Sequence, residues 1–129
     1  MASKIVKKWF SFSAKDLRTA KVLDEIGSDF WEQSVFFCQQ SIEKSLKGFL
    51  VFHKVRIRKV HDLVQIFALA RSHDQSLTGD ISELERLTEY AVAYRYPDAA
   101  SGEISHKDVK EAISAAEHFY AELSKKCGL

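Results

Sequence analysis

The sequence predicts an all-α protein: a single domain over residues 1–129, folded as an up-and-down helical bundle of about five helices. Three observations lead to this prediction. Apolar residues recur with helical spacing along most of the chain, above all between residues 29 and 53. The one proline and nearly all of the five glycines lie between these periodic segments. No stretch alternates apolar and polar residues over the length of a strand.

A first helix is expected to begin at Ser13, because Asp16 follows it at the spacing of a capping box. Gly27 is expected to end this helix. Its apolar side would consist of Ala14, Leu17, Ala20 and Leu23.

A long second helix is predicted from Asp29, which is followed by Glu32 at the same spacing, to about His53. One side of it carries a stripe that should face a core, formed by Trp31, Val35, Cys38, Ile42, Leu46 and Phe49. A second row lies beside it, formed by Phe30, Ser34, Phe37, Ser41 and Gly48. The row is small enough in places to let another backbone approach closely. A helix that is apolar over so much of its circumference is expected at the centre of the bundle.

Three shorter segments complete the prediction. After a basic loop at residues 54–59, a third helix is expected over residues 61–71, with Leu63, Ile66, Phe67 and Ala70 on its apolar side. Asp80 with Glu83 should cap a fourth helix that carries Leu84, Leu87, Ala91 and Val92 and ends before Pro97. Ser105 should cap a last helix, whose apolar residues are Val109, Ala112, Ile113, Ala116, Phe119, Tyr120 and Leu123.

Composition and charge exclude several classes of function. A net charge of +1 gives no overall attraction to nucleic acid or to membranes, so any such binding must come from a local patch. No window approaches the length of a membrane span, and the N-terminus lacks the apolar segment of a signal peptide. Cys38 and Cys127 are interpreted as reduced thiols, with Cys38 in the core. We therefore expect a cytoplasmic protein without membrane contact.

No metal or cofactor site is expected. None of the five histidines has a His or Cys partner three or four positions away on one helix, which is the spacing a zinc site would need. The sequence also lacks a glycine-rich phosphate loop, a dinucleotide fingerprint and a nucleophile-elbow motif.

A set of polar residues has side chains that suit phosphate or nucleotide contacts. Gln40, Lys44 and Lys47 follow one another at helical spacing on the second helix, and Glu43 lies at the edge of its core stripe. The loop adds Lys54, Arg56, Arg58 and Lys59, and Arg95 with Tyr96 adds a planar cation and a ring. Structural interpretations remain open for each group: a solvated loop, a helix break, and a buried polar network without a ligand.

Three motifs in this order resemble the HEPN domain family. They are Gln39-Gln40-Ser41-Ile42-Glu43-Lys44-Ser45-Leu46-Lys47-Gly48, Val60-His61-Asp62-Leu63 and Arg95-Tyr96-Pro97-Asp98. The chain departs from the family pattern at Ser41 and Gly48, where alanine is usual, and at Val60, which replaces a threonine. Without that hydroxyl, the helix near His61 must be capped otherwise, for example by Asp62.

The resemblance implies a compact bundle, commonly a homodimer, and in prokaryotes frequent pairing with a small nucleotidyltransferase. The residues that it implies for nucleotide or RNA binding are Gln40, Glu43, Lys44, Lys47, His61, Arg95, Tyr96 and Asp98. Lys47 and Arg95 would meet phosphate, and Tyr96 would stack on a base. We expect Arg95 to lie within salt-bridge or water-bridged reach of the polar row on the second helix, with Glu43 as its main partner.

Many members of the wider superfamily are metal-independent ribonucleases in which an arginine precedes a histidine by a short gap. Arg56 and His61 have that spacing, which makes them a candidate catalytic pair. The match is weak evidence, since chance alone produces such pairs in a chain of this composition. Ile57 also stands where the ribonucleases usually have a polar residue.

Three hypotheses therefore remain. The first is a dimeric protein that binds a nucleotide or RNA and pairs with a nucleotidyltransferase in a two-component, toxin–antitoxin-like system. The second is a ribonuclease toxin in which His61 transfers a proton and Arg56 stabilises the phosphorane. The third is a purely structural dimerisation module. A homodimer is expected because four phenylalanines offer more apolar surface than one small bundle covers: Phe36, Phe37, Phe49 and Phe52.

Overall fold

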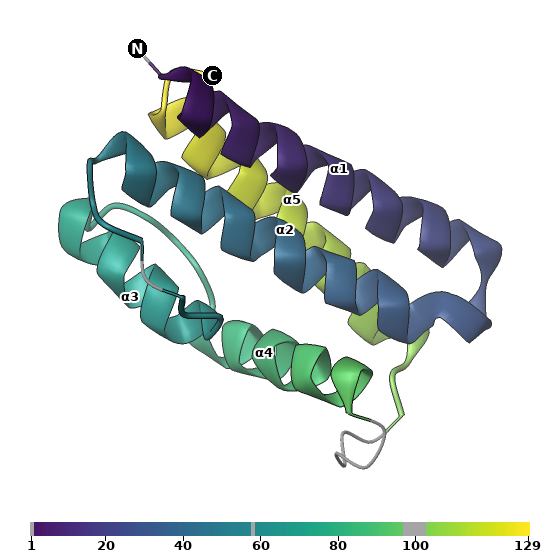
Figure 1. The fold of residues 1–129 in the computed structure, drawn as a ribbon. Helices are drawn as coiled ribbons and strands as arrows, with labels where there is room; N and C mark the ends of the chain where they lie inside the picture. Colours follow the sequence, from purple (N-terminus) through teal and green to yellow (C-terminus); the bar gives the residue numbers. More distant parts are fainter. Residues whose placement is uncertain (1, 58, 97–102) are drawn as a thin grey trace.

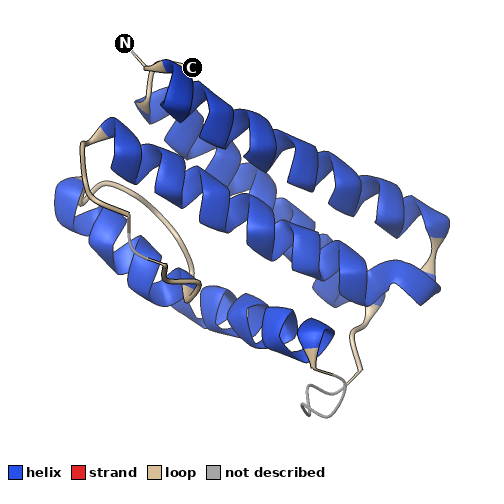
Figure 2. Ribbon diagram, viewed as in Figure 1, coloured by secondary structure: helices blue, strands red, loops and turns tan. Residues whose placement is uncertain are grey.

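The computed structural model describes residues 2–57, 59–96 and 103–129, and every regular element in these ranges is helical (Figures 1 and 2). The elements are α1 (Lys4–Ile26), the short 3-10 helix η1 (Ser28–Phe30), α2 (Trp31–Phe52), α3 (Leu63–His73), α4 (Ile81–Arg95) and α5 (His106–Lys126). The predicted all-α fold with five α-helices is confirmed.

The bundle has three long helices and a fourth position that two short helices share. Helices α1, α2 and α5 run side by side, while α3 and α4 lie end to end along α2 (Figure 1). The loop after α3 runs back along that helix, so α4 begins near the start of α3. Helix α2 contacts each of the other four α-helices, which is the central position predicted for it. Among the described helices none is long and apolar enough to cross a membrane.

The two apolar rows of α2 face different neighbours. The core stripe is confirmed for Val35, Cys38, Ile42, Leu46 and Phe49, which are fully buried, whereas Trp31 at its start is only partly buried. The row of small residues faces α1: the Ser34 hydroxyl donates to the Ala20 carbonyl at 2.7 Å. A Cβ atom on Gly48 would lie 2.9 Å from the Phe10 ring and 3.0 Å from the Trp9 Cβ. The expected close approach of a second backbone is thus made by α1.

The predicted start of the first helix at Ser13 is wrong. Helix α1 begins at Lys4, and the Ser3 hydroxyl caps it by accepting from the Val6 amide at 3.3 Å. Ser13 instead lies buried within the helix and donates to the Ser41 carbonyl of α2 at 2.7 Å. A serine in a helix interior is tolerated when its hydroxyl is satisfied, and here α2 supplies the acceptor.

The other helix starts follow the predictions more closely. Asp80 accepts from the Glu83 amide at the start of α4, and Ser105 forms a complete capping box with Asp108 at the start of α5. The third helix begins at Leu63, two residues later than expected, and Asp62 caps it. The cap predicted at Asp29 is not formed: η1 precedes α2, whose N-cap residue makes no side-chain cap bond.

Two expectations about apolar surface need correction. Val92, expected on the core side of the fourth helix, is 49% exposed, although Leu84, Leu87 and Ala91 are buried as predicted. Phe49, one of the four phenylalanines expected to offer a dimer surface, is fully buried inside the bundle. The partly exposed apolar surface on α2 is therefore smaller than the sequence suggested.

Both cysteines are free and buried. Burial, together with the nearby carboxylates of Asp24 and Glu117, raises the pKa of the Cys38 thiol to about 12. Burial also raises the pKa of Cys127 to about 11. Both thiols are consequently protonated near neutral pH and are poor nucleophiles.

Candidate functional site

A buried carboxylate in the middle of α2 organises the candidate site. Glu43 is only 6% exposed, and its Oε2 lies 3.0 Å from the Lys47 Nζ, one helical turn further along. The His61 Nδ1 lies 3.1 Å from the same oxygen, and the Gln39 amide donates to Oε1 at 3.3 Å. The carboxylate therefore has three polar partners, as a buried charge requires.

Two of these partners come from α2 itself, and the third comes from the chain that leads into α3. His61 directly precedes Asp62, whose side chain caps α3 by accepting from the Val64 amide at 2.9 Å. The Gln39 amide also donates to the His61 carbonyl at 3.4 Å. The cap and this bond hold the histidine backbone against α2 while its side chain remains 61% exposed.

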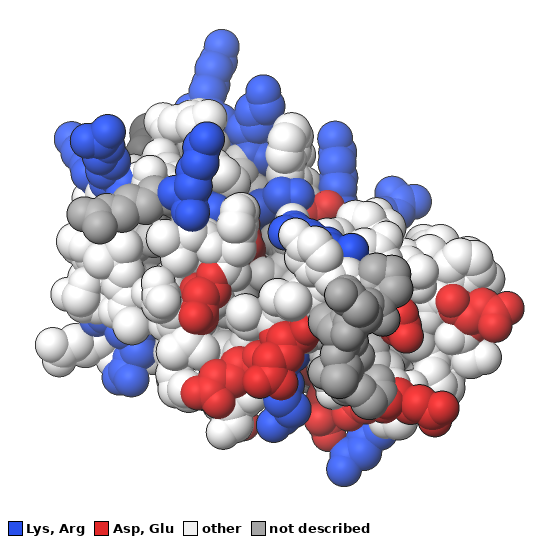
Figure 3. Space-filling view, turned by 60° about the horizontal axis from the view of Figure 1, so that its bottom comes forward, with Lys and Arg blue, Asp and Glu red and all other residues white. Residues whose placement is uncertain are grey.

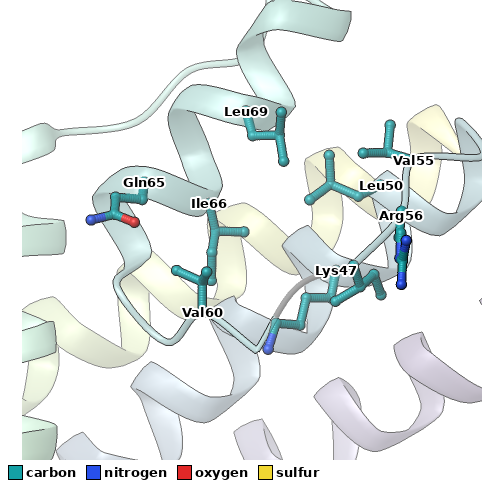
Figure 4. A pocket seen from close by; sticks show the side chains of 9 residues that line it. Lys47, Leu50, Val55, Arg56, Val60, Gln65, Ile66 and Leu69 are labelled. Atoms are coloured by element: carbon teal, nitrogen blue, oxygen red, sulfur yellow. The ribbon is translucent and has the colours of Figure 1, made fainter.

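Lys47 lines the larger of two cavities beside Glu43. This cavity has a volume of about 520 Å³ and lies between the C-terminal half of α2, the following loop and α3. Figure 4 shows Gln65 at one end, Arg56 at the other and Lys47 between them. The rest of the lining is apolar: Leu50, Val55, Ile57, Val60, Ile66 and Leu69.

The charge in this cavity is positive. Lys47 is paired with Glu43, whereas no carboxylate in the described ranges lies within ion-pair distance of Arg56. An apolar wall that carries one exposed guanidinium and one buried ammonium fits a ligand that has a flat or apolar body and an anionic group. No group of three or more His, Cys, Asp or Glu side chains is placed to hold a metal in the described part of the chain.

His61 lines the second, smaller cavity, which has a volume of about 240 Å³. Arg95 and Tyr96 at the end of α4 also line it, together with Gln39, Asp62, Thr88, Ala91 and Val92. Thr88 links α4 to the start of α3, since its hydroxyl accepts a hydrogen bond from the Leu63 amide at 3.2 Å. Arg56 and His61, the candidate catalytic pair, thus line different cavities.

The expected contact between Arg95 and Glu43 is not made. Glu43 is occupied by Lys47 and His61, and the Arg95 guanidinium lies 5.5 Å from the centroid of the Phe36 ring. Phe36 in turn stacks on Tyr94 with ring centroids 4.4 Å apart. Arg95 therefore packs as a cation on an aromatic ring, and both it and Tyr96 are exposed.

The remaining candidates lie at the margins of the site. Gln40 donates to the Gln39 side chain at 2.6 Å and so extends the network around Glu43. Lys44 points the other way and pairs with Asp16 of α1. Asp98, the last of the implied binding residues, lies outside the described residues.

Sequence reasoning missed the apolar wall of the larger cavity and the role of Asp16. Val55, Ile57 and Val60 are spaced through a loop without helical or strand periodicity, so no local pattern assigns them to a surface. The spacing of Asp16 from Ser13 fits a helix cap, which is a different role from the one it has. Only the packing of α1 on α2 shows that it pairs with Lys44.

Comparison with known proteins agrees with this architecture. The HEPN domain family model matches residues 6–126. A relative from Methanocaldococcus jannaschii, named "Putative toxin MJ1304", is 26% identical over 128 residues, covering 89% of this chain and 83% of the relative.

Two solved structures resemble the fold. TT1696 from Thermus thermophilus has a TM-score of 0.76 and 21% identity, over 96% of this chain and 99% of that one. ST0689, an archaeal HEPN homologue, has a TM-score of 0.67 and 22% identity, over 95% of this chain and 97% of that one. At these identities the likeness concerns the fold alone.

Proposed function

Because the chain belongs to the HEPN domain family, we propose that it binds a nucleotide or an RNA end in the cavity lined by Lys47 and Arg56. We further propose that it does so as the HEPN component of a two-component, toxin–antitoxin-like system. The observation that carries the binding proposal is the combination of two basic side chains, Lys47 and Arg56, with a mainly apolar wall.

Each part of that cavity suits one part of a nucleotide. Arg56 can bind a phosphate through two parallel hydrogen bonds, and its charge has no carboxylate partner in the described ranges. Lys47 adds a point charge whose position is fixed by Glu43. Ile66, Leu50 and their apolar neighbours offer contact area for a base or a sugar.

The second cavity supports the same class of ligand. Arg95 and Tyr96 bring a cation and an exposed ring to the side of His61, so a nucleotide that reaches across His61 could contact both cavities. The homologue called a toxin supports the system-level proposal, although its name concerns that protein. A small nucleotidyltransferase is the partner that the family resemblance implies.

Binding is tested with fluorescently labelled adenosine monophosphate and a short labelled RNA. Arg56→Ala should weaken both by about tenfold, since a charge-assisted hydrogen bond to phosphate is lost. Lys59→Ala is the matched control, because Lys59 is exposed on the same loop but does not line the cavity. Equal affinity of the wild type and Arg56→Ala would refute the proposed site.

The partner is tested separately. The gene beside that of this chain should encode a small nucleotidyltransferase, and co-expression of the two proteins should yield one complex that elutes together on gel filtration. Independent elution of the two proteins at tens of micromolar, roughly the range in which a specific interface persists, would remove the partner proposal and leave the binding proposal intact.

A ribonuclease is the second candidate, and one observation favours it. Glu43 contacts the Nδ1 atom of His61 at 3.1 Å, which orients the imidazole and leaves Nε2 free for proton transfer. Against it, Arg56 lines a different cavity from His61, whereas a ribonuclease needs both groups on one phosphate.

We therefore expect binding without efficient cleavage. RNA incubated with the purified protein in EDTA should remain intact, and Arg56→Ala or His61→Ala should alter affinity or stability more than turnover. Metal-independent cleavage that disappears in a folded His61→Ala variant would reverse this conclusion and make the ribonuclease the function.

A further inference from the structure

A second basic feature lies on α1, outside both cavities. Phe12 is 44% exposed, and three ammonium groups surround its ring. The Nζ atoms of Lys8 and Lys15 lie 5.8 Å from the ring centroid, and that of Lys44 lies 5.9 Å from it. We call Phe12 with these three lysines the Phe12 patch.

The charge around this patch is strongly one-sided. Residues 4–18 of α1 contain five basic side chains (Lys4, Lys7, Lys8, Lys15 and Arg18) and a single acidic one, Asp16, which pairs with Lys44. In the view of Figure 3, many of the Lys and Arg side chains gather along the upper edge, and most of the Asp and Glu side chains lie below them. A chain with a net charge of only +1 thus presents a local basic surface.

We propose that the Phe12 patch is a contact site for single-stranded RNA. The exposed ring would stack on a base, while Lys8 and Lys15 would neutralise the adjacent phosphates. Along α2 the patch and the larger cavity are about one helical turn apart, because Lys44, which contacts Phe12, lies three residues before Lys47, which lines the cavity. The inference rests on the proposed function in one respect: the strand that crosses the patch is the one whose end enters the cavity.

A membrane surface fits the patch less well than RNA does. An interfacial helix inserts a continuous apolar face, whereas the apolar face of α1, with Val6, Phe10 and Leu17, is buried in the bundle. Its exposed apolar side chains near the patch, Ile5 and Phe12, are separated by Lys8. An exposed aromatic ring among cations, such as Phe12, is the pattern of a stacking platform.

The test is fluorescence anisotropy of the full chain with a labelled single-stranded RNA. Phe12→Ala should weaken binding by about tenfold, because one stacked base is lost, and Phe12→Tyr should keep the wild-type affinity.

The lysines are tested by the salt dependence of binding. Lys8→Gln with Lys15→Gln should lower the slope of log affinity against log salt concentration by roughly 1.4, or about 0.7 for each lost phosphate contact. The matched control, Lys107→Gln with Lys110→Gln, removes the same charge from exposed positions of α5 and should leave the slope nearly unchanged.

A short ligand separates the patch from the cavity. Adenosine monophosphate is too small to span both. Phe12→Ala should therefore bind it with wild-type affinity, whereas Arg56→Ala should bind it about tenfold more weakly. If the monophosphate fails to bind and Phe12→Ala still loses RNA affinity, the cavity proposal fails and the patch stands. Wild-type RNA affinity in a folded Phe12→Ala variant overturns the patch. The patch is also overturned as an RNA site if its variants leave RNA affinity unchanged while the protein binds phosphatidylserine vesicles.

Discussion

Glu43 illustrates how one buried charge can determine the positions of several functional groups. Its carboxylate meets an ammonium, an imidazole and an amide within a network that excludes most water. Lys47 is equally buried, with 8% of its side chain exposed. Neither member of this pair can lose its partner without leaving an uncompensated charge in the interior.

Glu43→Ala should therefore lower the free energy of unfolding by roughly 3 kcal/mol, because Lys47 is left unpaired. Adding Lys47→Met should recover much of that loss, since the double variant buries no charge. Urea denaturation of the four proteins in this double-mutant cycle measures the coupling. Additive effects of the two substitutions would show that the pair is energetically unimportant.

Gly48 permits the close packing of α1 on α2. In a helix alanine is intrinsically favoured over glycine by about 1 kcal/mol, but here a Cβ atom would meet the Phe10 ring at 2.9 Å. Gly48→Ala should destabilise the protein by about 1–3 kcal/mol, the usual cost of overpacking. Ser11→Ala, on the exposed side of α1, is the control and should change stability by less than about 0.5 kcal/mol. A gain in stability from Gly48→Ala would mean that propensity outweighs packing.

At the level of elements, one loop is hydrogen-bonded to a helix that lies far from it in the sequence. The loop between α3 and α4 is fastened to α5 at two points. Thr78 donates its hydroxyl to Glu122 at 2.8 Å, and Lys126 donates to Asp74 at 2.9 Å. These bonds fix the return path that brings α4 back to the start of α3, and thereby position Arg95 and Tyr96 near His61.

Asp74 gives this loop a measurable dependence on pH. Hydrogen bonds from Ser76 and Lys126 hold the pKa of its carboxyl well below the ordinary value of 3.8. A carboxyl with a lowered folded-state pKa stabilises the fold fully above its unfolded pKa, and this contribution is lost as the pH falls through the folded pKa. The wild type should therefore lose its stability advantage over Asp74→Asn as the pH drops below about 4.

Thermal unfolding of both proteins between neutral and strongly acidic pH measures that difference. Glu85→Gln, at an exposed position of α4, provides the control and should follow the wild type throughout. A constant gap between the wild type and Asp74→Asn at every pH would show that the carboxyl charge is not responsible.

At the scale of the whole molecule, the exposed apolar side chains around Phe36 form a candidate surface for dimerisation. Phe36 and Tyr94 form a stacked pair that joins α2 to the end of α4, and Val92 and Tyr96 beside it are 49% and 59% exposed. This aromatic and aliphatic patch lies next to the cavity of His61, which Val92 and Tyr96 help to line. A second copy bound there would bring another surface to the edge of the candidate site.

The chain is accordingly expected to be a homodimer, and Val92→Asp should make it monomeric by placing a charge in the interface. Light scattering at tens of micromolar, roughly where a specific interface should persist, gives the oligomeric state. Ile26, at the end of α1, is 61% exposed and lies outside this patch, so Ile26→Asp adds the same charge there and should leave the dimer intact. A monomeric wild type at this concentration would refute the expectation.

The sequence by itself determined the helices, the central place of α2 and its core stripe. Helical periodicity and the caps at Asp80 and Ser105 are local properties that neighbouring residues encode directly. The same local rules failed at Ser13, where a capping-box spacing occurs inside a helix. Its hydroxyl is satisfied across the interface with α2 instead of by its own backbone.

The tertiary structure decided which side chains of the candidate site contact one another. The polar residues of α2 were identified from the sequence, but Glu43 pairs with Lys47 and His61 instead of Arg95, and Lys44 pairs with Asp16. The Glu43–Lys47 pair follows from a spacing of four residues along one helix. The contacts with His61 and Asp16 depend instead on the rotation and spacing of whole helices and on the course of the loop before α3. The sequence thus supplied the charged groups, and packing determined which of them meet.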